Sequence, residues 1–330
     1  MTGKFLILGA NSFSGATFAD FVAEQSIDVI ATSRSEQSAP AFLPYTWTPR
    51  QGSVRFDTVD LNHDLDKLAA ILKSDRPTHV VNFAAQSMVG QSWENPDHWM
   101  MTNVVSTVQL HELLRKCDWL ERYVHVTTPE VYGSTDGWVK ENTPFNPSTP
   151  YAVSRAAADM SLRTYVDQYD FPAVSTRAAN VFGPGQQLYR IIPRTILAGI
   201  AGKKMTLDGG GVSTRSFITM RDVSDATLKV ALSGKVGDTY HISTDRMVSI
   251  RELVEKIFDD LGADFDSLVT IGPERPGKDS AYMLDSAKIR SELGWSDEET
   301  LEDGIAQTVE WANKFKDDLV ATNPDYVHKP

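Results

Sequence analysis

The sequence predicts an α/β protein in which a parallel β-sheet is covered by helices on both faces. Short β-rich runs alternate with helical patterns over the first 180 residues, which is the order of β-α-β crossovers. The predicted strands are apolar along both faces, as in a parallel sheet buried between two helical layers. After Asn180 this alternation is lost and Gly and Pro cluster, so a second, smaller domain is expected there.

The predicted elements follow one another in the order of a Rossmann-type, doubly wound fold. Apolar runs predict strands over Lys4–Leu8, Asp28–Thr32, His79–Phe83, Tyr123–Val126 and Ala173–Arg177. Apolar residues spaced by three or four predict helices over Gly15–Glu24, Leu65–Ser74, Met100–Lys116 and Tyr151–Tyr169. Two further amphipathic helices are predicted over Ile250–Leu261 and Leu301–Trp311, followed by a loosely ordered polar tail over Lys316–Pro330.

The loss of the strand–helix alternation after Asn180 predicts the domain organisation of the chain. Residues 1–180 are expected to form the Rossmann domain, and residues 217–245 to return to it. Residues 181–330 are expected to form a smaller mixed α/β domain that binds substrate. The cluster Gly183-Pro184-Gly185 lies near the start of this segment.

Composition excludes several classes of protein. The 330 residues have a net charge of −12, from 32 Lys and Arg against 44 Asp and Glu, so they lack the broad basic face of a nucleic-acid-binding protein. Neither a signal peptide nor an apolar run of about 18 residues is evident. Cys117 is the sole cysteine and the histidines form no i,i+4 pair, so no disulfide or metal site is predicted. We expect a cytoplasmic protein without a membrane partner.

The first strand ends in a glycine-containing turn that opens a helix. Small residues there let backbone N–H groups approach a pyrophosphate at the helix N-terminus, although a generic strand-to-helix turn also uses glycine. The candidate cofactor-binding residues in this turn are Gly9, Asn11, Ser12, Phe13, Ser14 and Gly15.

The end of the second strand bears on which dinucleotide is bound. An acidic residue there accepts hydrogen bonds from the ribose hydroxyls of NAD, whereas an arginine accommodates the 2′-phosphate of NADP. The strand ends in Ser33 and Arg34, which favour NADP, unless Arg34 is simply a solvated loop residue. Further candidate contacts follow the next two β-like runs: Asp60 and Leu61 beside the adenine, and Phe83, Ala84 and Ala85 against the cofactor.

Residue types suited to proton transfer and substrate binding are predicted at the carboxyl edge of the sheet. They are Gln86 and Ser87, Thr128 and Glu130, and Tyr151 and Arg155. Tyr151 and Arg155 are four apart, so on a helix they share a face. A tyrosine that acts as a base needs its pKa lowered from about 10, and a fixed cation favours the phenolate. By itself, the pair also fits an ordinary helix start with a surface arginine.

Taken together, these motifs resemble the extended short-chain dehydrogenase/reductases that act on nucleotide sugars, and most of all the NDP-sugar 4,6-dehydratases. The resemblance covers nearly the whole chain. Its motifs are the turn Gly9–Gly15, Asn82–Ser87, Thr128-x-Glu130-Val131-Tyr132-Gly133, Ser148-x-Pro150-Tyr151, Arg177-x-x-Asn180-x-x-Gly183-Pro184 and the C-terminal run from Arg275-Pro276-Gly277 to Trp311. The last run is more similar to the 4,6-dehydratases than to the 4-epimerases.

The resemblance implies a reaction and roles for particular residues. Tyr151 takes the proton of the sugar 4-hydroxyl, Thr128 bonds the 4-oxygen and Glu130 removes the C5 proton before water leaves from C6. NAD, tightly held in the family, takes and returns the hydride. The implied substrate contacts are Gln86, Ser87, Thr128, Asn180, Ile192, Arg215 and Arg275, and the implied assembly is a homodimer joined by helices Met100–Lys116 and Tyr151–Tyr169.

Three positions depart from the family pattern. Ser12 replaces the middle glycine of the turn, Arg155 replaces the usual lysine, and Pro129 stands where the dTDP-glucose enzymes have a proton-donating Asp. Because proline has no proton to give, a 4-epimerase, a C4 oxidoreductase and a 4-keto-sugar reductase remain alternatives. A catalytically inactive nucleotide-binding protein is a third reading, which the retained Thr128, Glu130 and Tyr151 oppose.

Overall fold

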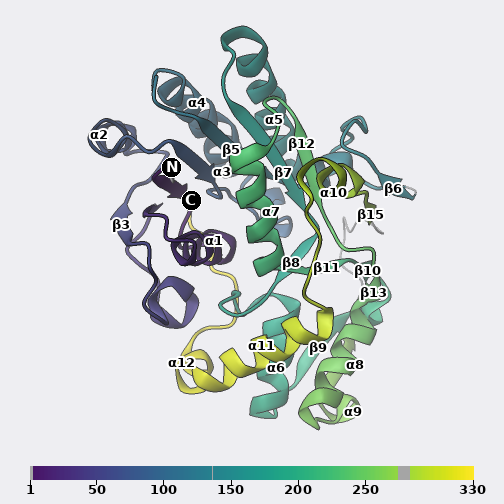
Figure 1. The fold of residues 1–330 in the computed structure, drawn as a ribbon. Helices are drawn as coiled ribbons and strands as arrows, with labels where there is room; N and C mark the ends of the chain where they lie inside the picture. Colours follow the sequence, from purple (N-terminus) through teal and green to yellow (C-terminus); the bar gives the residue numbers. More distant parts are fainter. Residues whose placement is uncertain (1–2, 136, 274–282) are drawn as a thin grey trace.

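A parallel sheet forms the centre of the computed structural model, which describes residues 3–135, 137–273 and 283–330 (Figure 1). Within these residues the sheet has seven strands in the order β12-β7-β5-β4-β1-β2-β3, and all neighbouring pairs are parallel. The strands are β1 (Phe5–Leu8), β2 (Val29–Ser33), β3 (Val54–Thr58), β4 (His79–Asn82), β5 (Arg122–Thr127), β7 (Ala173–Ala178) and β12 (Thr239–Ile242). The strand order reverses between β1 and β4, where doubly wound folds open a crevice for ligands.

Helices cover both faces of the sheet because its strands are apolar on both sides. Phe5 and Ile7 of β1 pack in one core with α1, α7 and α10, whereas Leu6 and Leu8 pack in another with α2, α4 and α5. The helices are α1 (Phe13–Glu24), α2 (Leu65–Asp75), α4 (Thr107–Leu114), α5 (Pro150–Tyr169), α7 (Met220–Ser233) and α10 (Ala287–Leu293). Residues 217–242 thus add α7 and the edge strand β12 to the sheet layer.

The smaller lobe below the sheet in Figure 1 consists of helices and short paired strands. Its helices are α6 (Ile191–Ala201), α8 (Ile250–Leu261), α9 (Phe265–Leu268), α11 (Leu301–Lys314) and α12 (Lys316–Ala321). Its paired strands are β8 (Asn180–Phe182) with β11 (Phe217–Thr219), β9 (Met205–Asp208) with β14 (Val269–Gly272), and β10 (Thr214–Arg215) with β13 (Val248–Ser249). A separate apolar core joins α6, α8, α11 and α12. The strands β6 (Trp138–Val139) and β15 (Met283–Leu284) also pair.

The predicted strands and most predicted helices agree with the structure to within two residues, with two corrections. The helix predicted over Met100–Lys116 is instead α3 (Pro96–Met100), a π-helix over Met101–Ser106, and α4. This wider turn contains the buried Asn103. Its side chain accepts a hydrogen bond from the Gln86 N–H and donates to the Gln86 carbonyl and the Ser154 hydroxyl, each at 2.9 Å. The tail prediction is wrong for residues 316–321, which form α12.

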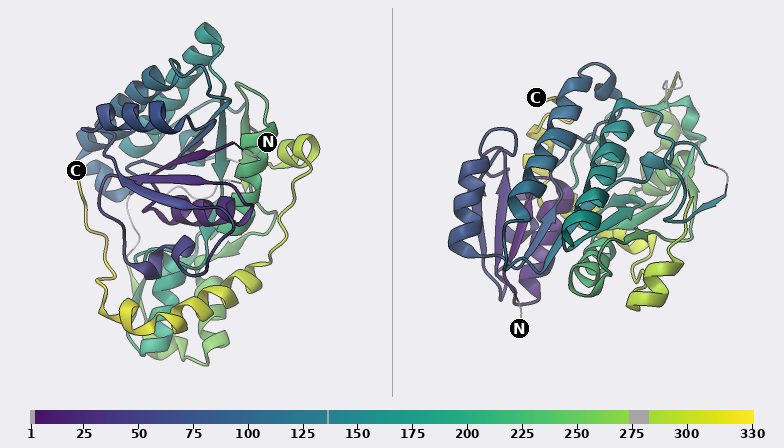
Figure 2. Two further views of the ribbon diagram at one scale, coloured as in Figure 1. Left: turned by 60° about the vertical axis from the view of Figure 1, so that its left-hand side comes forward. Right: turned by 90° about the horizontal axis from the view of Figure 1, so that it is seen from above.

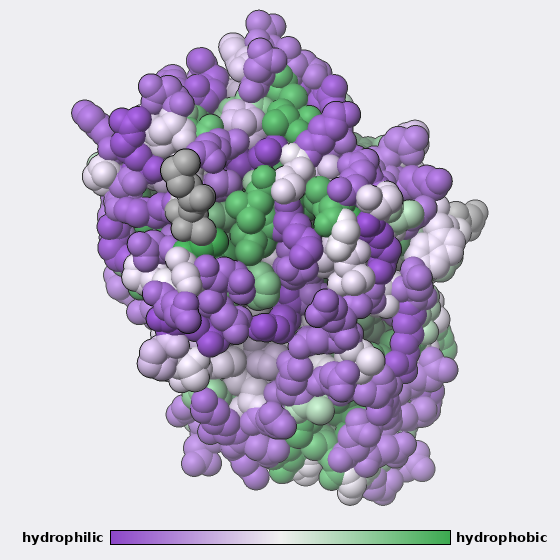
Figure 3. Space-filling model, in the orientation of Figure 1, coloured by the Kyte–Doolittle hydropathy of each residue, from purple (hydrophilic) through white to green (hydrophobic). Residues whose placement is uncertain are grey.

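Polar residues cover most of the face seen in Figure 3, and hydrophobic residues gather there in small separate patches. In the part of the chain that the structure describes, no helix is both long and apolar enough to cross a membrane. Among the same residues, no group of three or more His, Cys, Asp or Glu side chains is arranged to hold a metal ion.

Candidate active site

A cleft of about 860 Å³ opens at the carboxyl ends of the central strands and continues down to α6 of the smaller lobe. It brings together the three polar segments that the sequence analysis predicted to meet at this edge. Every predicted site residue lines the cleft except two: Gly15, which packs beneath the β1–α1 turn, and Arg275, which lies outside the described residues. The cleft is therefore the candidate active site.

The turn between β1 and α1 is too compact to admit side chains at its glycines. Gly9 has a φ of 84°, and a Cβ there would lie 2.6 Å from the Ala84 nitrogen. A Cβ on Gly15 would lie 2.4 Å from the Gly9 carbonyl oxygen. Ser12 closes the turn, since its hydroxyl donates to the Gly9 carbonyl at 2.7 Å and accepts from the Gly15 N–H at 3.1 Å. With Phe13 and Ser14 lining the cleft at the N-terminus of α1, the turn fits a dinucleotide pyrophosphate.

Asn11 holds the loop that follows β2 against this turn. Its side-chain amide donates to the carbonyls of Ser35 and Glu36 at 3.1 and 2.9 Å, and its carbonyl accepts from the Ser38 N–H at 3.1 Å. Asn11 therefore positions the loop that contains Arg34, a role that the sequence pattern did not indicate. The Arg34 guanidinium donates to two main-chain carbonyls near the end of the described chain, those of Lys329 at 3.1 Å and Pro330 at 2.5 Å.

The predicted catalytic residues lie on two elements that meet in the cleft. Thr128 caps the one-turn helix Pro129–Tyr132, accepting from the Glu130 N–H at 3.3 Å, so this turn presents both residues at the end of β5. Tyr151 stands in the first turn of α5, which Thr149 caps, and it is 8% exposed. Burial raises the pKa of Tyr151, while the charge of Arg155 opposes that rise. A nearby positive charge is thus needed for Tyr151 to act as a base.

Arg155 is fixed beneath Tyr151 by the main chain of β5 and lies next to a buried ionic network. It is 2% exposed, and its guanidinium donates to the Val126 carbonyl of β5. One turn further along α5, the Asp159 carboxylate accepts from Arg177 at 2.8 Å and lies 3.3 Å from the His125 ring nitrogen. Burial opposes the charge of Asp159, but the His125 hydrogen bond and the neighbouring arginines hold its pKa at about 2. The cations beneath the site therefore have a permanently charged partner.

The far side of the cleft contains the residues predicted to contact substrate. Asn180 donates to the Ser216 carbonyl at 3.2 Å, the buried Ile192 lies on α6, and Arg215 donates to the Thr214 carbonyl at 2.8 Å. Gln86 and Ser87 line the opposite wall.

The sequence did not predict several other residues that line the cleft, among them Tyr189, Arg190, Arg194, Tyr326, Val327 and Lys329. The sequence could have predicted Arg190 and Arg194 as cleft residues, because they are four apart at the start of a helix and flank Ile192. Residues 326–329 have no such sequence pattern, because a short polar segment without periodicity is indistinguishable from a solvated tail.

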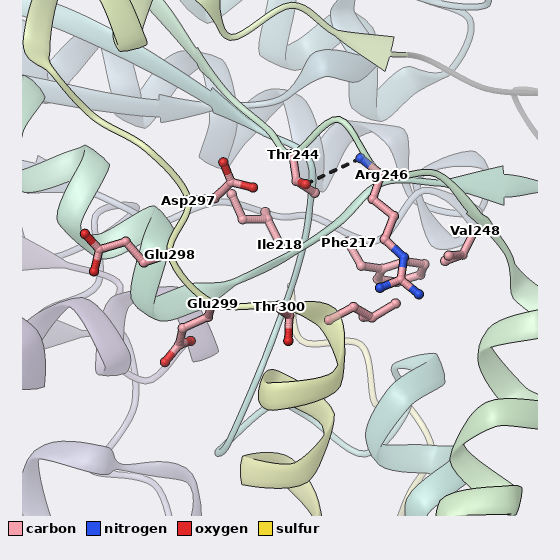
Figure 4. Close-up of a pocket in the computed structure, with 10 residues that line it drawn as sticks. Phe217, Ile218, Thr244, Arg246, Val248, Asp297, Glu298, Glu299 and Thr300 are labelled. Atoms are coloured by element: carbon pink, nitrogen blue, oxygen red, sulfur yellow. Dashed lines mark hydrogen bonds between the residues drawn. The ribbon is translucent and has the colours of Figure 1, made fainter.

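A second cavity, of about 220 Å³, lies between the acidic stretch Asp297–Thr300 and the β11 residues Phe217 and Ile218 (Figure 4). Arg246 reaches in from the opposite side and pairs with Glu302 at 2.7 Å, and Asp297 pairs with Arg290 at 2.5 Å. Among the described residues, none of the predicted site residues lines this cavity, so the candidate chemistry belongs to the larger cleft.

The doubly wound sheet, the glycine turn and the Thr-x-Glu and Tyr-x-x-x-Arg pairs define a nucleotide-sugar enzyme of the short-chain dehydrogenase/reductase class. The chain belongs to the GDP-mannose 4,6 dehydratase family, whose model matches residues 6–308. It is 30% identical to the dTDP-glucose 4,6-dehydratase of Neisseria gonorrhoeae, over 93% of this chain and 95% of that protein.

Solved structures agree with this assignment. The dTDP-glucose 4,6-dehydratase of Streptomyces venezuelae, with NAD and TYD bound, is 32% identical with a TM-score of 0.86, covering 95% of this chain and 98% of that one. The UDP-glucose 4-epimerase of Thermotoga maritima also has a TM-score of 0.86, over 95% and 99% of the two chains, but at 23% identity it shares the fold alone.

The buried network beneath the site predicts a large effect from a small change. Asp159→Asn removes the charged partner of Arg177 and leaves buried cations uncompensated, so we expect the free energy of unfolding to fall by about 3–5 kcal/mol in urea denaturation. The matched control is Asp167→Asn on the same helix, whose partner Arg163 is exposed. We expect that change to cost less than about 1 kcal/mol. Equal effects of the two substitutions would contradict the network's role.

Proposed function

We propose that the protein is an NDP-hexose 4,6-dehydratase that converts a nucleotide sugar to its 4-keto-6-deoxy form. The observation that supports this most directly is the joint placement of Thr128, Glu130 and Tyr151 in one cleft with the compact β1–α1 turn. The named activity of the relatives supports the same reaction. Arg190, Arg194 and Arg215, on the far side of the cleft, have the charge that a substrate diphosphate requires.

Each catalytic side chain has a task that its surroundings suit. Tyr151 removes the proton of the sugar 4-hydroxyl, and Thr128 donates a hydrogen bond to the 4-oxygen. The C5 proton, acidified by the 4-ketone, passes to Glu130. The 6-hydroxyl then leaves as water. The β1–α1 turn would hold NAD, which would supply the redox chemistry by taking the hydride from C4 and returning it to C6. Because burial raises the pKa of Tyr151, the fixed charge of Arg155 is essential to the first step.

Pro129 favours a second candidate function on the same scaffold. It is buried at the first position of the one-turn helix and lines the cleft, where a proton donor would assist the departure of the 6-hydroxyl. Without elimination, the same Tyr151 and Thr128 support oxidation and reduction at C4. A 4-epimerase, a C4 oxidoreductase or a 4-keto-sugar reductase is therefore the alternative.

The proposed reaction is tested by incubating the purified protein with dTDP-, UDP-, CDP- and GDP-hexoses and identifying products by mass spectrometry and NMR. We expect one of them to lose water and give a 4-keto-6-deoxy sugar. Tyr151→Phe should lower turnover by about 10²–10⁴-fold while cofactor binding is retained. Tyr169→Phe, at the exposed end of the same helix, should leave turnover unchanged. A C4 epimer or a reduced sugar without water loss would establish the alternative.

A substitution at Pro129 tests whether the missing acid limits the reaction. Pro129→Asp places a carboxyl group at the first position of the one-turn helix, where a helix N-terminus favours an acidic side chain. We expect the rate of water loss to rise by about tenfold or more, since a general acid contributes about 10²–10⁴-fold when well placed. Pro129→Ala is the control and should give no gain. A rate unchanged by Asp would mean that another group already protonates the leaving hydroxyl.

We propose that two copies associate through a four-helix interface. Apolar side chains stand exposed on two adjacent helical segments that contact each other. They are Met101 and Val105 on the π-helix, with 48% and 44% exposure, and Val153 and Met160, seven residues apart on one face of α5, with 41% and 63% exposure. Such a surface is covered when the same helices of a second copy pack against it.

Sedimentation velocity tests this interface. Met160→Glu places a charge in the centre of the apolar surface, so we expect the dimer to dissociate to monomers. Leu232→Glu, a comparably exposed apolar residue at the end of α7, is the control and should leave the dimer intact. A Met160→Glu protein that still sediments as a dimer would refute the proposed interface.

A further inference from the structure

The segment after α12, residues 322–330, leaves the smaller lobe and returns to the sheet layer; we term it the strap. In Figure 2 it runs from α12 along the side of the molecule and ends near the helices of the sheet layer. Tyr326, Val327 and Lys329 of the strap line the candidate active site. The strap therefore connects the two lobes beside the cleft.

Two side chains anchor the strap. Tyr326 packs edge-on against Tyr189, with ring centroids 5.4 Å apart, and its hydroxyl lies 3.2 Å from His328. The His328 ring stacks on His98 and on the buried Trp99 of α3, with both centroid distances 5.1 Å. Asp325 and Val327, on either side of Tyr326, are exposed. This alternation is that of a docked extended segment, with every second side chain directed inward.

The anchored strap presents main-chain carbonyls to both walls of the cofactor end of the cleft. The Lys329 carbonyl accepts from the Gln86 side chain at 2.7 Å and from Arg34 at 3.1 Å. The Pro330 carbonyl accepts from Arg34 at 2.5 Å. Arg34 follows β2, on the loop that Asn11 holds, which is the position that reads the 2′ substituent of a bound dinucleotide.

We propose that the strap selects NAD over NADP by binding Arg34. An adenosine 2′-phosphate offers acceptors alone, so it needs the guanidinium that the strap carbonyls bind, and their partial negative charge repels it. A 2′-hydroxyl is itself a donor and is compatible with a carbonyl-rich surrounding. Because the strap is tethered to the same chain, its carbonyls compete at a high effective concentration. This inference rests on the dinucleotide site of the proposed function.

The test measures the dissociation constants of NAD and NADP for cofactor-free, full-length protein by titration calorimetry. Tyr326→Ser/His328→Ser removes both anchors. We expect the ratio of the NADP to the NAD dissociation constant to fall by about tenfold, because Arg34 becomes available for a charge-assisted pair with the phosphate. Adding Arg34→Ala to this variant should abolish the gain. Asp325→Ser, at an exposed position of the strap that does not line the cleft, is the matched control and should leave the ratio unchanged.

Three results would overturn the inference in different ways. An unchanged ratio in the anchor variant would show that the strap does not affect the 2′ site. An equal gain in affinity for both cofactors would show that the strap merely obstructs the cleft. If neither dinucleotide binds the unaltered protein, the dinucleotide site fails as well, and the proposed function fails with it.

Discussion

The Asp159 carboxylate, on the buried side of α5, fixes the wall of the cleft that contains the proposed catalytic residues. It lies against His125 of β5 and Arg177 of β7, so one charged group joins a helix to two neighbouring strands. Arg177 also donates to the Tyr132 hydroxyl, which extends the network to the one-turn helix containing Glu130. The spacing between the end of β5, where Thr128 lies, and the start of α5, where Tyr151 lies, depends on these contacts.

The two lobes contribute different chemistry to one cleft. The sheet layer contributes the compact turn at Gly9 and the residues proposed for proton transfer, whereas α6 and the paired strands of the smaller lobe contribute arginines. The proposed nucleotide-sugar substrate would therefore contact both lobes. The strap extends from α12 to the sheet layer, where hydrogen bonds to Arg34 and Gln86 hold it, so the geometry of the cofactor end is coupled to the packing of the smaller lobe.

The three departures from the family pattern have different physical consequences. Ser12 is compatible with the turn because its hydroxyl bonds at both ends of it, at Gly9 and Gly15. Arg155 retains the positive charge beneath Tyr151, but its guanidinium is directed to the Val126 carbonyl and sheds no proton. Pro129, by contrast, supplies no proton in place of the acid that it replaces. This departure therefore bears most strongly on the choice between dehydration and simple redox chemistry at C4.

Local patterns in the sequence determined the sheet, most helices and the catalytic pairs, because apolar periodicity and motif spacing are properties of neighbouring residues. Only the tertiary structure decided where long-range polar contacts form. The π-helix around Asn103 follows from its bonds to Gln86 and Ser154, and the Asp159 network joins residues from three elements. Arg34 is the clearest case. Its position after β2 predicted a phosphate contact, yet main-chain carbonyls some 295 residues away in the sequence bind it. Because every residue has a backbone carbonyl, no sequence pattern could have predicted this contact.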